Sequence, residues 1–263
     1  MTRPPLKQMF AAGDVTFGSW LTLAHPAVAE IMAKSGFDWL VIDLEHSVIT
    51  IREAEELIRV VELCGVAPLV RLTSNDANQI KRVMDSGACG VVVPMVNSRE
   101  EAERAVAAVQ YPPRGVRGVG LARAQGWGPK FDEYRAWLAR DAVVIVQIEH
   151  VKAVERLQSI LTTPGVDGFI VGPYDLSGSL GVPGEFEHPL MADALREILR
   201  IAAGVGAMPG FHVVPPQPAL VEERLREGYR LIGYSVDTMF LGESCRDGLH
   251  RLRGRVRPQG TAQ

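Results

Sequence analysis

Several acidic residues and one histidine of this chain follow its short apolar runs at positions where they could act together. Trp39–Asp43 leads into Glu45 and His46, Val143–Ile148 leads into Glu149, and Gly168–Val171 leads into Asp175. Such β-branched, nearly continuous runs suit strands that are covered on both faces, as in parallel sheets. If the strands close into a barrel, their carboxyl ends meet at one rim, where such folds place metal ions and catalysis.

Glu149 and Asp175 are the candidate metal ligands. Two carboxylates from neighbouring strand ends suit a hard divalent cation such as Mg2+, which leaves other positions for water and substrate oxygens. Gln147 lies two residues before Glu149, so both side chains point to the same inward face, where a polar pair is costly to bury unless it is used. A pair of rim carboxylates held in salt bridges is the alternative interpretation.

The second and third runs supply a candidate base and a candidate oxyanion partner. Asp43 and His46 are three residues apart, so their side chains can meet, and a carboxylate that orients an imidazole makes it a better general base. Glu45 is the alternative partner of His46, or a neighbour of the metal. Arg71 ends the strand-like segment 68–71, and its guanidinium suits an oxyanion or enolate. The alternative for Arg71 is a salt bridge to Asp43 or Glu45.

Two loops are candidates for holding substrate. In segment 172–181 small residues surround Asp175, and the backbone N–H groups of Tyr174 and Asp175 could bind a carboxylate. A plain strand-to-helix turn is the alternative. The longest stretch without periodicity, 111–137, mixes arginines such as Arg123 with Gln, Trp and glycines. Long loops in compact domains are usually functional or disordered, so we expect a binding loop here.

The elements that must position these residues alternate along the chain. Eight apolar runs are predicted as strands: Phe17–Leu23, Trp39–Asp43, Pro68–Leu72, Gly90–Met95, Val143–Ile148, Gly168–Val171, Gly210–Val214 and Leu231–Val236. Eight segments have helical spacing: Ala27–Lys34, Ile51–Cys64, Asn75–Ser86, Arg99–Val109, Lys152–Leu161, Pro189–Val205, Pro218–Glu227 and Thr238–Leu252. Ser98 and Glu101 predict a capping box.

This alternation predicts an α/β fold, a (β/α)8 TIM barrel, with a doubly wound sheet as the alternative. We expect residues 1–263 to form a single domain, with a C-terminal helix at about 238–253 and a polar tail.

The composition excludes several classes of function. The 263 residues include 28 basic and 31 acidic side chains, a net charge of −3, which provides no basic field for nucleic acid or a membrane surface. No apolar run approaches the ~18 residues of a membrane-spanning helix. Three scattered cysteines without a CxxC pair indicate reduced thiols and a cytoplasmic protein. Phosphate-loop, dinucleotide-binding, serine-hydrolase and zinc-protease motifs are absent.

Taken together and in order, the motifs resemble one family, the HpcH/HpaI aldolases, which are class II, metal-dependent pyruvate aldolases. The resemblance covers about residues 15–245 and rests on segments 36–46, 68–71, 93–96, 111–118, 146–149 and 166–177. It implies reversible cleavage of a 4-hydroxy-2-oxo acid to pyruvate and an aldehyde. It also implies a homo-oligomer, a hexamer built as a trimer of dimers, in which the C-terminal helix is exchanged between barrels.

The resemblance assigns metal binding and proton transfer to particular residues. Glu149 and Asp175 would bind a divalent metal cation, Mg2+, Mn2+ or Co2+, with Gln147 beside them. His46, paired with Asp43, would serve proton transfer. The lysines of this chain lie in helical or loop segments rather than at inward strand ends, which counts against a Schiff-base mechanism.

The resemblance also assigns residues to the substrate. Arg71 would stabilise the enolate oxygen of pyruvate, and the amides of Tyr174 and Asp175 would hold its carboxylate. Asp85 matches an acid that reaches the active-site region. The chain departs from the family's pattern where the aldehyde half should bind: Tyr174 replaces an alanine, and the segment around Arg123 replaces a serine-containing one. The pyruvate chemistry is thus intact, while the acceptor is not identified.

Two other functions stay open. One is a lyase of the citrate- or malyl-CoA type, which would need a basic cluster on the rim, and only Arg114, Arg117 and Arg123 could supply it. The other is a non-catalytic barrel that binds a metabolite. It would bind pyruvate with metal without exchanging the methyl protons.

Overall fold

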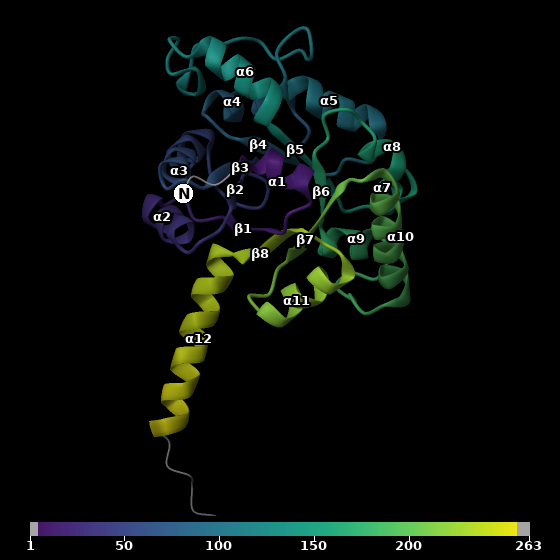
Figure 1. Cartoon of the computed structure of the whole chain (residues 1–263). Coiled ribbons are helices and arrows are strands. Elements are labelled where there is room, and N and C mark those ends of the chain that lie inside the picture. Colours follow the sequence, from purple (N-terminus) through teal and green to yellow (C-terminus); the bar gives the residue numbers. More distant parts are fainter. Residues whose placement is uncertain (1–4, 257–263) are drawn as a thin grey trace, which may run out of the picture.

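The chain folds around a closed barrel of parallel strands. The computed structural model describes residues 5–256. Its strands are β1 Thr16–Leu21, β2 Trp39–Asp43, β3 Ala67–Arg71, β4 Gly90–Val93, β5 Val143–Ile148, β6 Gly168–Val171, β7 Met208–Val213 and β8 Leu231–Val236. Each strand pairs with its neighbours along the chain, and β1 pairs with β8 (Figure 1). The predicted (β/α)8 TIM barrel is therefore confirmed, and the doubly wound sheet is excluded.

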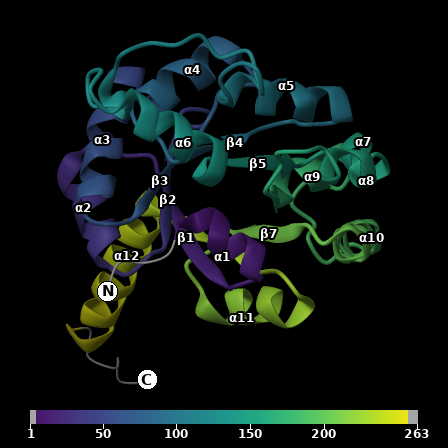
Figure 2. The same ribbon diagram turned by 45° about the horizontal axis from the view of Figure 1, so that its top comes forward.

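The helices connect successive strands and surround the barrel, except for the first, which precedes β1, and the last, which follows β8 (Figures 1 and 2). They are α1 Leu6–Ala12, α2 Pro26–Lys34, α3 Ile51–Leu63, α4 Ala77–Asp85, α5 Arg99–Val109, α6 Phe131–Asp141, α7 Val151–Glu155, α8 Leu157–Leu161, α9 Pro173–Ser179, α10 Pro189–Val205, α11 Pro218–Glu227 and α12 Asp237–Val256, with a 3-10 turn η1 at Arg123–Gln125. Among residues 5–256 no helix has the length and apolar character needed to cross a membrane.

The structure corrects the predicted helices in several places. The expected helix Lys152–Leu161 is two short helices, α7 and α8, on either side of Arg156. The helices α1, α6 and α9 are not predicted by the periodicity. Two of them, α1 and α9, have only seven residues each, too few to show a helical period. Because α6 begins at Phe131, the predicted loop 111–137 ends earlier than expected and includes η1.

The predicted capping box at Ser98 is only half formed. The Ser98 hydroxyl accepts a hydrogen bond from the Glu101 N–H at 3.3 Å, as expected. The Glu101 carboxylate, however, accepts from the N–H of Asn97 at 2.6 Å instead of from Ser98. A complete capping box stands at the start of α3, between Thr50 and Glu53.

The barrel interior is filled by apolar side chains and becomes polar at its carboxyl end. Trp20, Trp39 and Leu69 belong to the inner cluster, which Leu6 and Phe10 of α1 close at the amino ends of the strands. A second cluster fills the layer between strands and helices. Alternate residues of a strand share a face. Two residues after the inward-facing Val41, Leu69 and Ile145, the next inward positions are therefore occupied by Asp43 on β2, Arg71 on β3 and Gln147 on β5. The fold thus brings these three polar groups to one rim.

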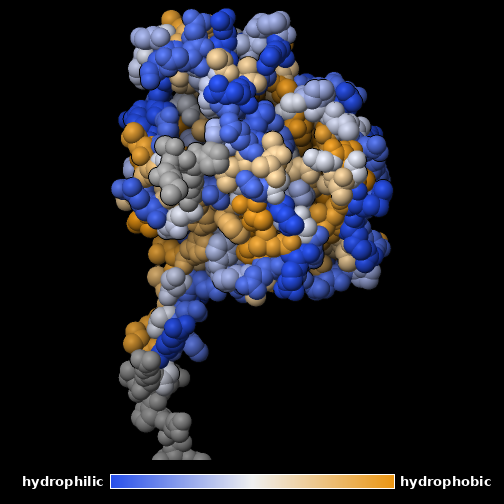
Figure 3. All heavy atoms as spheres, in the orientation of Figure 1, coloured by the Kyte–Doolittle hydropathy of each residue, from blue (hydrophilic) through white to orange (hydrophobic). Residues whose placement is uncertain are grey.

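Helix α12 leaves the barrel after β8 and projects away from it (Figures 1 and 2). Its first turn is anchored by Phe240, whose ring centroid lies 5.1 Å from that of Tyr234. Leu241, Leu249 and Leu252 are exposed, and hydrophobic residues are visible along the projecting part in Figure 3. Helix α12 extends to Val256, past its predicted end at about 253. Residues 257–263, which belong to the predicted polar tail, lie outside the described residues.

Candidate active site

Asp43 and Arg71 form a buried ion pair at the carboxyl ends of β2 and β3, where they are paired in register. Arg71 donates from Nε to Asp43 Oδ1 at 2.9 Å and from Nη2 to Oδ2 at 2.6 Å. The Asp43 side chain is 1% exposed and that of Arg71 is 9% exposed. Bidentate pairs of this kind are strong and fix the orientation of both groups. The salt bridge that was the alternative for Arg71 is therefore present.

The charge on Asp43 is stabilised by its surroundings. Burial alone would raise the pKa of Asp43, but Arg71 and the N–H groups of His46 and Glu45 hold that pKa below its usual 3.8. The N–H groups of Glu45 and His46 donate to Oδ1 at 3.0 and 3.3 Å. Asp43 thus fixes both the guanidinium of Arg71 and the loop that carries His46.

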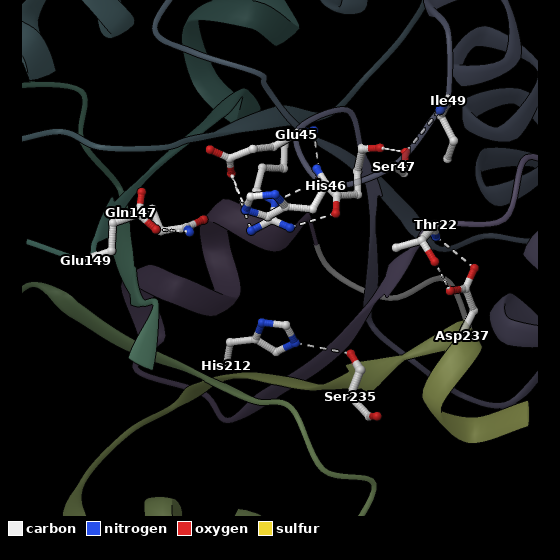
Figure 4. A network of polar contacts seen from close by, with 12 residues as sticks. Thr22, Glu45, His46, Ser47, Ile49, Gln147, Glu149, His212, Ser235 and Asp237 are labelled. Carbon is white, nitrogen blue, oxygen red and sulfur yellow. Dashed lines mark hydrogen bonds and ion pairs between the residues drawn. The ribbon is translucent and has the colours of Figure 1, made fainter. Parts of the chain in front are cut away.

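The His46 ring does not contact the Asp43 carboxylate, contrary to the expected pairing. The Asp43 oxygens are taken by Arg71 and by backbone N–H groups. His46 Nε2 lies 3.8 Å from Glu45 Oε2, and the His46 side chain is 64% exposed. The same Glu45 oxygen is 3.5 Å from Arg71 Nη1. Among residues 5–256 the carboxylate nearest the His46 ring is that of Glu45, the alternative partner (Figure 4).

Glu149 follows β5 and is held from two sides. Its Oε1 accepts the N–H of Met95 at 2.6 Å, and its Oε2 accepts a hydrogen bond from the Gln147 amide. The side chains of Gln147 and Glu149 lie together, as the alternation predicts (Figure 4). Met95 has a φ of 52°, which costs a non-glycine residue about 1–3 kcal/mol. The surrounding fold therefore imposes the conformation that aims this N–H at Glu149.

The end of β6 leaves room for this pair. A Cβ on Gly172 would lie 2.9 Å from Glu149 Oε2 and 3.2 Å from Gln147 Nε2, so a larger residue would displace both side chains. The short helix α9 begins directly afterwards, with the exposed Asp175 in its first turn. Tyr174 is 53% exposed, and its ring meets that of Phe186 edge-on with 4.9 Å between centroids.

Several carboxylates influence one another at this rim. Burial raises the pKa of Glu149 and the charge of Asp175 raises it further, while the hydrogen bonds from Met95 and Gln147 oppose the shift. Burial also raises the pKa of Glu45 to about 7, against the effect of Arg71 and with added repulsion from Glu149 and Asp175. Carboxylates that disfavour each other's charge in this way form a site that a cation would stabilise.

The donor atoms fit a hard divalent cation. Gln147 Oε1 is buried and accepts no hydrogen bond from the described residues; Glu45 Oε2 accepts none either, but it faces Arg71 Nη1 at 3.5 Å. Buried polar atoms without a partner are rare and require an explanation, such as an ion or water. Residues 5–256 contain no group of three or more His, Cys, Asp or Glu side chains arranged as a metal site. A cation here would thus have one or two protein carboxylates and otherwise water or substrate oxygens, as Mg2+ prefers.

Asp85 and Arg123 lie at the other end of the barrel. Helix α4 runs back against the strand direction, and Asp85 at its end is five residues before β4 begins at Gly90. Asp85 Oδ1 is 2.8 Å from Nη2 of Arg117. Arg123 pairs with Glu62 and donates to a backbone carbonyl at 3.0 Å. One chain therefore does not bring these two predicted site residues to Glu149, and their expected role would need a second copy of the chain.

The segment before α6 is an ordered scaffold built around Arg117. This side chain is buried; it donates to the Tyr134 hydroxyl at 2.9 Å and stacks 4.6 Å from the Tyr111 ring centroid. Gln125 donates to the Tyr111 hydroxyl at 2.7 Å. Arg114 donates to the Ala139 carbonyl near the end of α6 at 3.3 Å, so all three candidate arginines are engaged at the end of the barrel opposite Glu149. Within one chain they therefore do not supply the basic cluster on the rim that a CoA thioester would need.

Two features of the site were not predicted as site components. The sequence, in which Glu45 lies between Asp43 and His46, indicated Glu45 only as an alternative partner of His46 or a neighbour of the metal. The role of the Met95 N–H depends on a positive φ at a non-glycine residue, which leaves no signal in the sequence.

Below the rim, the His212 ring stacks on Trp20 with 4.0 Å between centroids. Burial and the nearby Arg71 lower the pKa of His212 to about 4, so it is neutral at physiological pH.

Known proteins have a similar fold and a related sequence. The model of the HpcH/HpaI aldolase/citrate lyase family matches residues 16–243. A 2-keto-3-deoxy-L-rhamnonate aldolase from Salmonella gallinarum (strain 287/91 / NCTC 13346) is 36% identical over 242 residues, covering 91% of this chain and 90% of the relative. An HpcH/HpaI aldolase/citrate lyase family protein from Burkholderia cenocepacia J2315 superposes with a TM-score of 0.90 at 32% identity, covering 94% of this chain and 98% of the other.

An HpcH/HpaI aldolase from Desulfitobacterium hafniense DCB-2 gives a TM-score of 0.88 at 32% identity, covering 99% of this chain and 100% of the other. The match of fold, length and sequence extends over almost the whole chain. The chain therefore belongs to the HpcH/HpaI aldolase/citrate lyase family, as its motifs predict.

Proposed function

We propose that this chain is a metal-dependent class II aldolase that reversibly cleaves a 4-hydroxy-2-oxo acid to pyruvate and an aldehyde. The observation that carries the proposal is the group of mutually repelling carboxylates on the barrel rim beside the positioned Arg71 and the exposed His46. The aldolase relative supports it, because a 2-keto-3-deoxy acid has the C2 ketone, C3 methylene and C4 hydroxyl that this reaction needs.

Glu149 and Asp175 would hold the divalent cation, which we propose to be Mg2+, Mn2+ or Co2+. When bound, the cation supplies positive charge beside the C2 oxygen, where negative charge develops during cleavage. The unpartnered Oε1 of Gln147 supports the proposal, since it can accept a hydrogen bond from a water molecule around the ion.

The chain's own residues would divide the remaining work. His46 takes the proton of the C4 hydroxyl as the C3–C4 bond breaks, and the electron pair of that bond becomes the C2–C3 double bond of the enolate. Arg71 donates to the C2 oxygen from Nη1, because Asp43 accepts hydrogen bonds from Nε and Nη2, whereas Glu45 faces Nη1 only at 3.5 Å. The amides of Tyr174 and Asp175 hold the carboxylate of pyruvate. Protonation at C3 then completes the pyruvate product.

Substitution of Glu149 tests this assignment. Glu149→Gln should lower Mg2+-dependent pyruvate release from a 2-keto-3-deoxy acid by about 100-fold or more, because the charge that holds the cation is removed. Glu155→Gln on α7 is the control, since Glu155 is exposed and outside the site. Equal activity of the two variants would refute the role of Glu149.

We further propose that the protein is a cytoplasmic homo-oligomer, a hexamer built as a trimer of dimers, with α12 exchanged between barrels. The exposed leucines on the projecting part of α12 support this, because a second barrel would cover them. A neighbouring copy could also bring its Asp85 and Arg123 to the Glu149 rim. Light scattering on the intact chain measures the assembly.

A further inference from the structure

A cavity of about 130 Å3 lies close to the candidate active site, because its lining residue His212 stacks on Trp20, whose ring centroid is 5.8 Å from Cζ of Arg71. Its walls come from the residues that follow β6 and β7, from the loop before α10, and from the facing sides of α10 and α11. The lining residues used below are Tyr174, Phe186, Met191, Leu195, Val214 and Leu220. Val214 directly follows β7 and Tyr174 lies three residues beyond the end of β6, so this part of the cavity wall is at the carboxyl ends of the strands, the end that carries Glu149. Tyr174 also adjoins Asp175 in the chain.

The walls of the cavity carry no free positive charge. Arg224 is its one basic lining residue apart from the neutral His212. Arg224 forms ion pairs from Nη1 to Glu227 Oε2 at 2.8 Å and from Nη2 to Glu223 Oε1 at 3.2 Å. Its Cζ atom lies 5.0 Å from the ring centroid of Phe211. Because the acidic Glu223 and Glu187 line the cavity as well, a carboxylate placed there would be repelled.

We propose that this cavity receives the substituent of the aldehyde and that the preferred substituent is uncharged and apolar, about the size of an isobutyl or phenyl group. The inference rests on the proposed aldolase function and adds the class of acceptor. An apolar protein cavity of about 150 Å3 accommodates benzene, which sets the size. The perpendicular rings of Tyr174 and Phe186 give the wall an aromatic surface for such a group.

The position of the cavity suits the reaction. The aldehyde carbon becomes C4 of the product, two bonds from the C2 carbonyl, so its substituent must extend from the metal site along the rim. The proposed pyruvate-binding amide of Tyr174 lies at one end of this path, and the Tyr174 ring lines the cavity at the other. The part of the cavity that Met191, Leu195 and Leu220 form offers no hydrogen bonds to a polar, sugar-like chain.

The test compares kcat/KM for aldol addition of pyruvate to 3-methylbutanal, acetaldehyde and succinic semialdehyde, in separate series with excess Mg2+, Mn2+ and Co2+. One methylene in an apolar pocket is worth about 10-fold or more, so 3-methylbutanal should exceed both others by at least that factor. Exchange of pyruvate methyl protons in D2O, which needs no aldehyde, is measured in parallel. If exchange is normal but the kcat/KM values for the three aldehydes agree within about 3-fold, this inference alone is overturned. If exchange is absent, the proposed function is overturned with it.

Two variants locate the preference. Leu220→Phe should fill the cavity and lower the ratio of kcat/KM for 3-methylbutanal over acetaldehyde by about 10-fold. Phe186→Ala, at a side chain that is 38% exposed, removes part of the wall and should lower the same ratio without threatening the fold. Leu63→Phe is the control, because Leu63 is 79% exposed on α3. An unchanged ratio in both cavity variants, or the same fall in the control, would place the preference elsewhere and refute the proposal.

Discussion

Removal of the charge on Asp43 should strongly destabilise the barrel. Asp43→Asn keeps the shape of the side chain but leaves Arg71, which is 9% exposed, without its bidentate partner. Loss of one partner of a buried ion pair typically costs about 3–5 kcal/mol. Glu45 lies 3.5 Å from Arg71 Nη1 and would compensate in part. We therefore expect the free energy of unfolding to fall by about 3 kcal/mol, at the lower end of that range.

Equilibrium unfolding in urea near neutral pH measures this loss. The matched control is Glu55→Gln on α3, which breaks a 3.1 Å pair with Arg59 whose side chains are 34% and 47% exposed. Exposed pairs of this kind contribute less than about 1 kcal/mol. If Asp43→Asn costs no more than the control, the ion pair does not stabilise the fold as the structure implies.

The pH dependence of stability provides an independent test of the same pair. The pKa of Asp43 is lowered in the folded protein from its usual 3.8, so its contribution is present above that value and is lost as the pH falls through the folded pKa. The difference in unfolding free energy between the wild type and Asp43→Asn should not shrink between pH 7 and pH 5, where protonation of Glu45 removes its compensation in the variant, and should shrink only below about pH 4. A difference that already disappears between pH 7 and pH 5 would contradict the assigned shift.

Three further predictions concern the reaction, the cation and the assembly. His46→Ala should lower kcat for aldol cleavage by about 100-fold or more with KM little changed, because His46 moves a proton and does not bind pyruvate. If steady-state kinetics showed equal changes in kcat and KM, His46 would be a binding residue. Because burial raises the pKa of Glu149, calorimetry should find that Mn2+ binding weakens at a higher pH than it would for a carboxylate with the ordinary pKa of 4.5, and an affinity that stays constant down to pH 4.5 would exclude this carboxylate as the ligand. Leu249→Asp with Leu252→Asp should reduce the mass found by light scattering, and an unchanged mass would show that α12 is not at the subunit interface.

Local sequence predicts the strands of this fold well. The runs at Trp39–Asp43, Val143–Ile148, Gly168–Val171 and Leu231–Val236 match the observed strands because apolar residues end abruptly there at polar residues or glycine. The alternation of side chains also places Gln147 and Glu149 together. These features depend on neighbours within a few residues, so the sequence alone contains them.

Features that depend on distant residues were not predictable in this way. Spacing allowed Asp43 to meet the His46 ring, but Arg71, 28 residues away, competes for the same carboxylate and binds it in two places. Asp85 and Arg123 have residue types suited to a site, yet which end of the barrel they occupy depends on the direction of α4 and on the segment around η1. Long-range competition and chain direction therefore limit prediction of the site more than prediction of the fold.

Formation of a pyruvate enolate at the Glu149 and Asp175 rim is the central claim. Proton NMR of pyruvate in D2O, recorded with EDTA and then with excess Mg2+, Mn2+ or Co2+, follows exchange of the methyl protons directly. We predict exchange only after a cation is added, and none above background with Glu149→Gln. No exchange with any of the three cations, in a wild-type protein shown to be folded, would contradict the aldolase assignment and favour a barrel that only binds its metabolite.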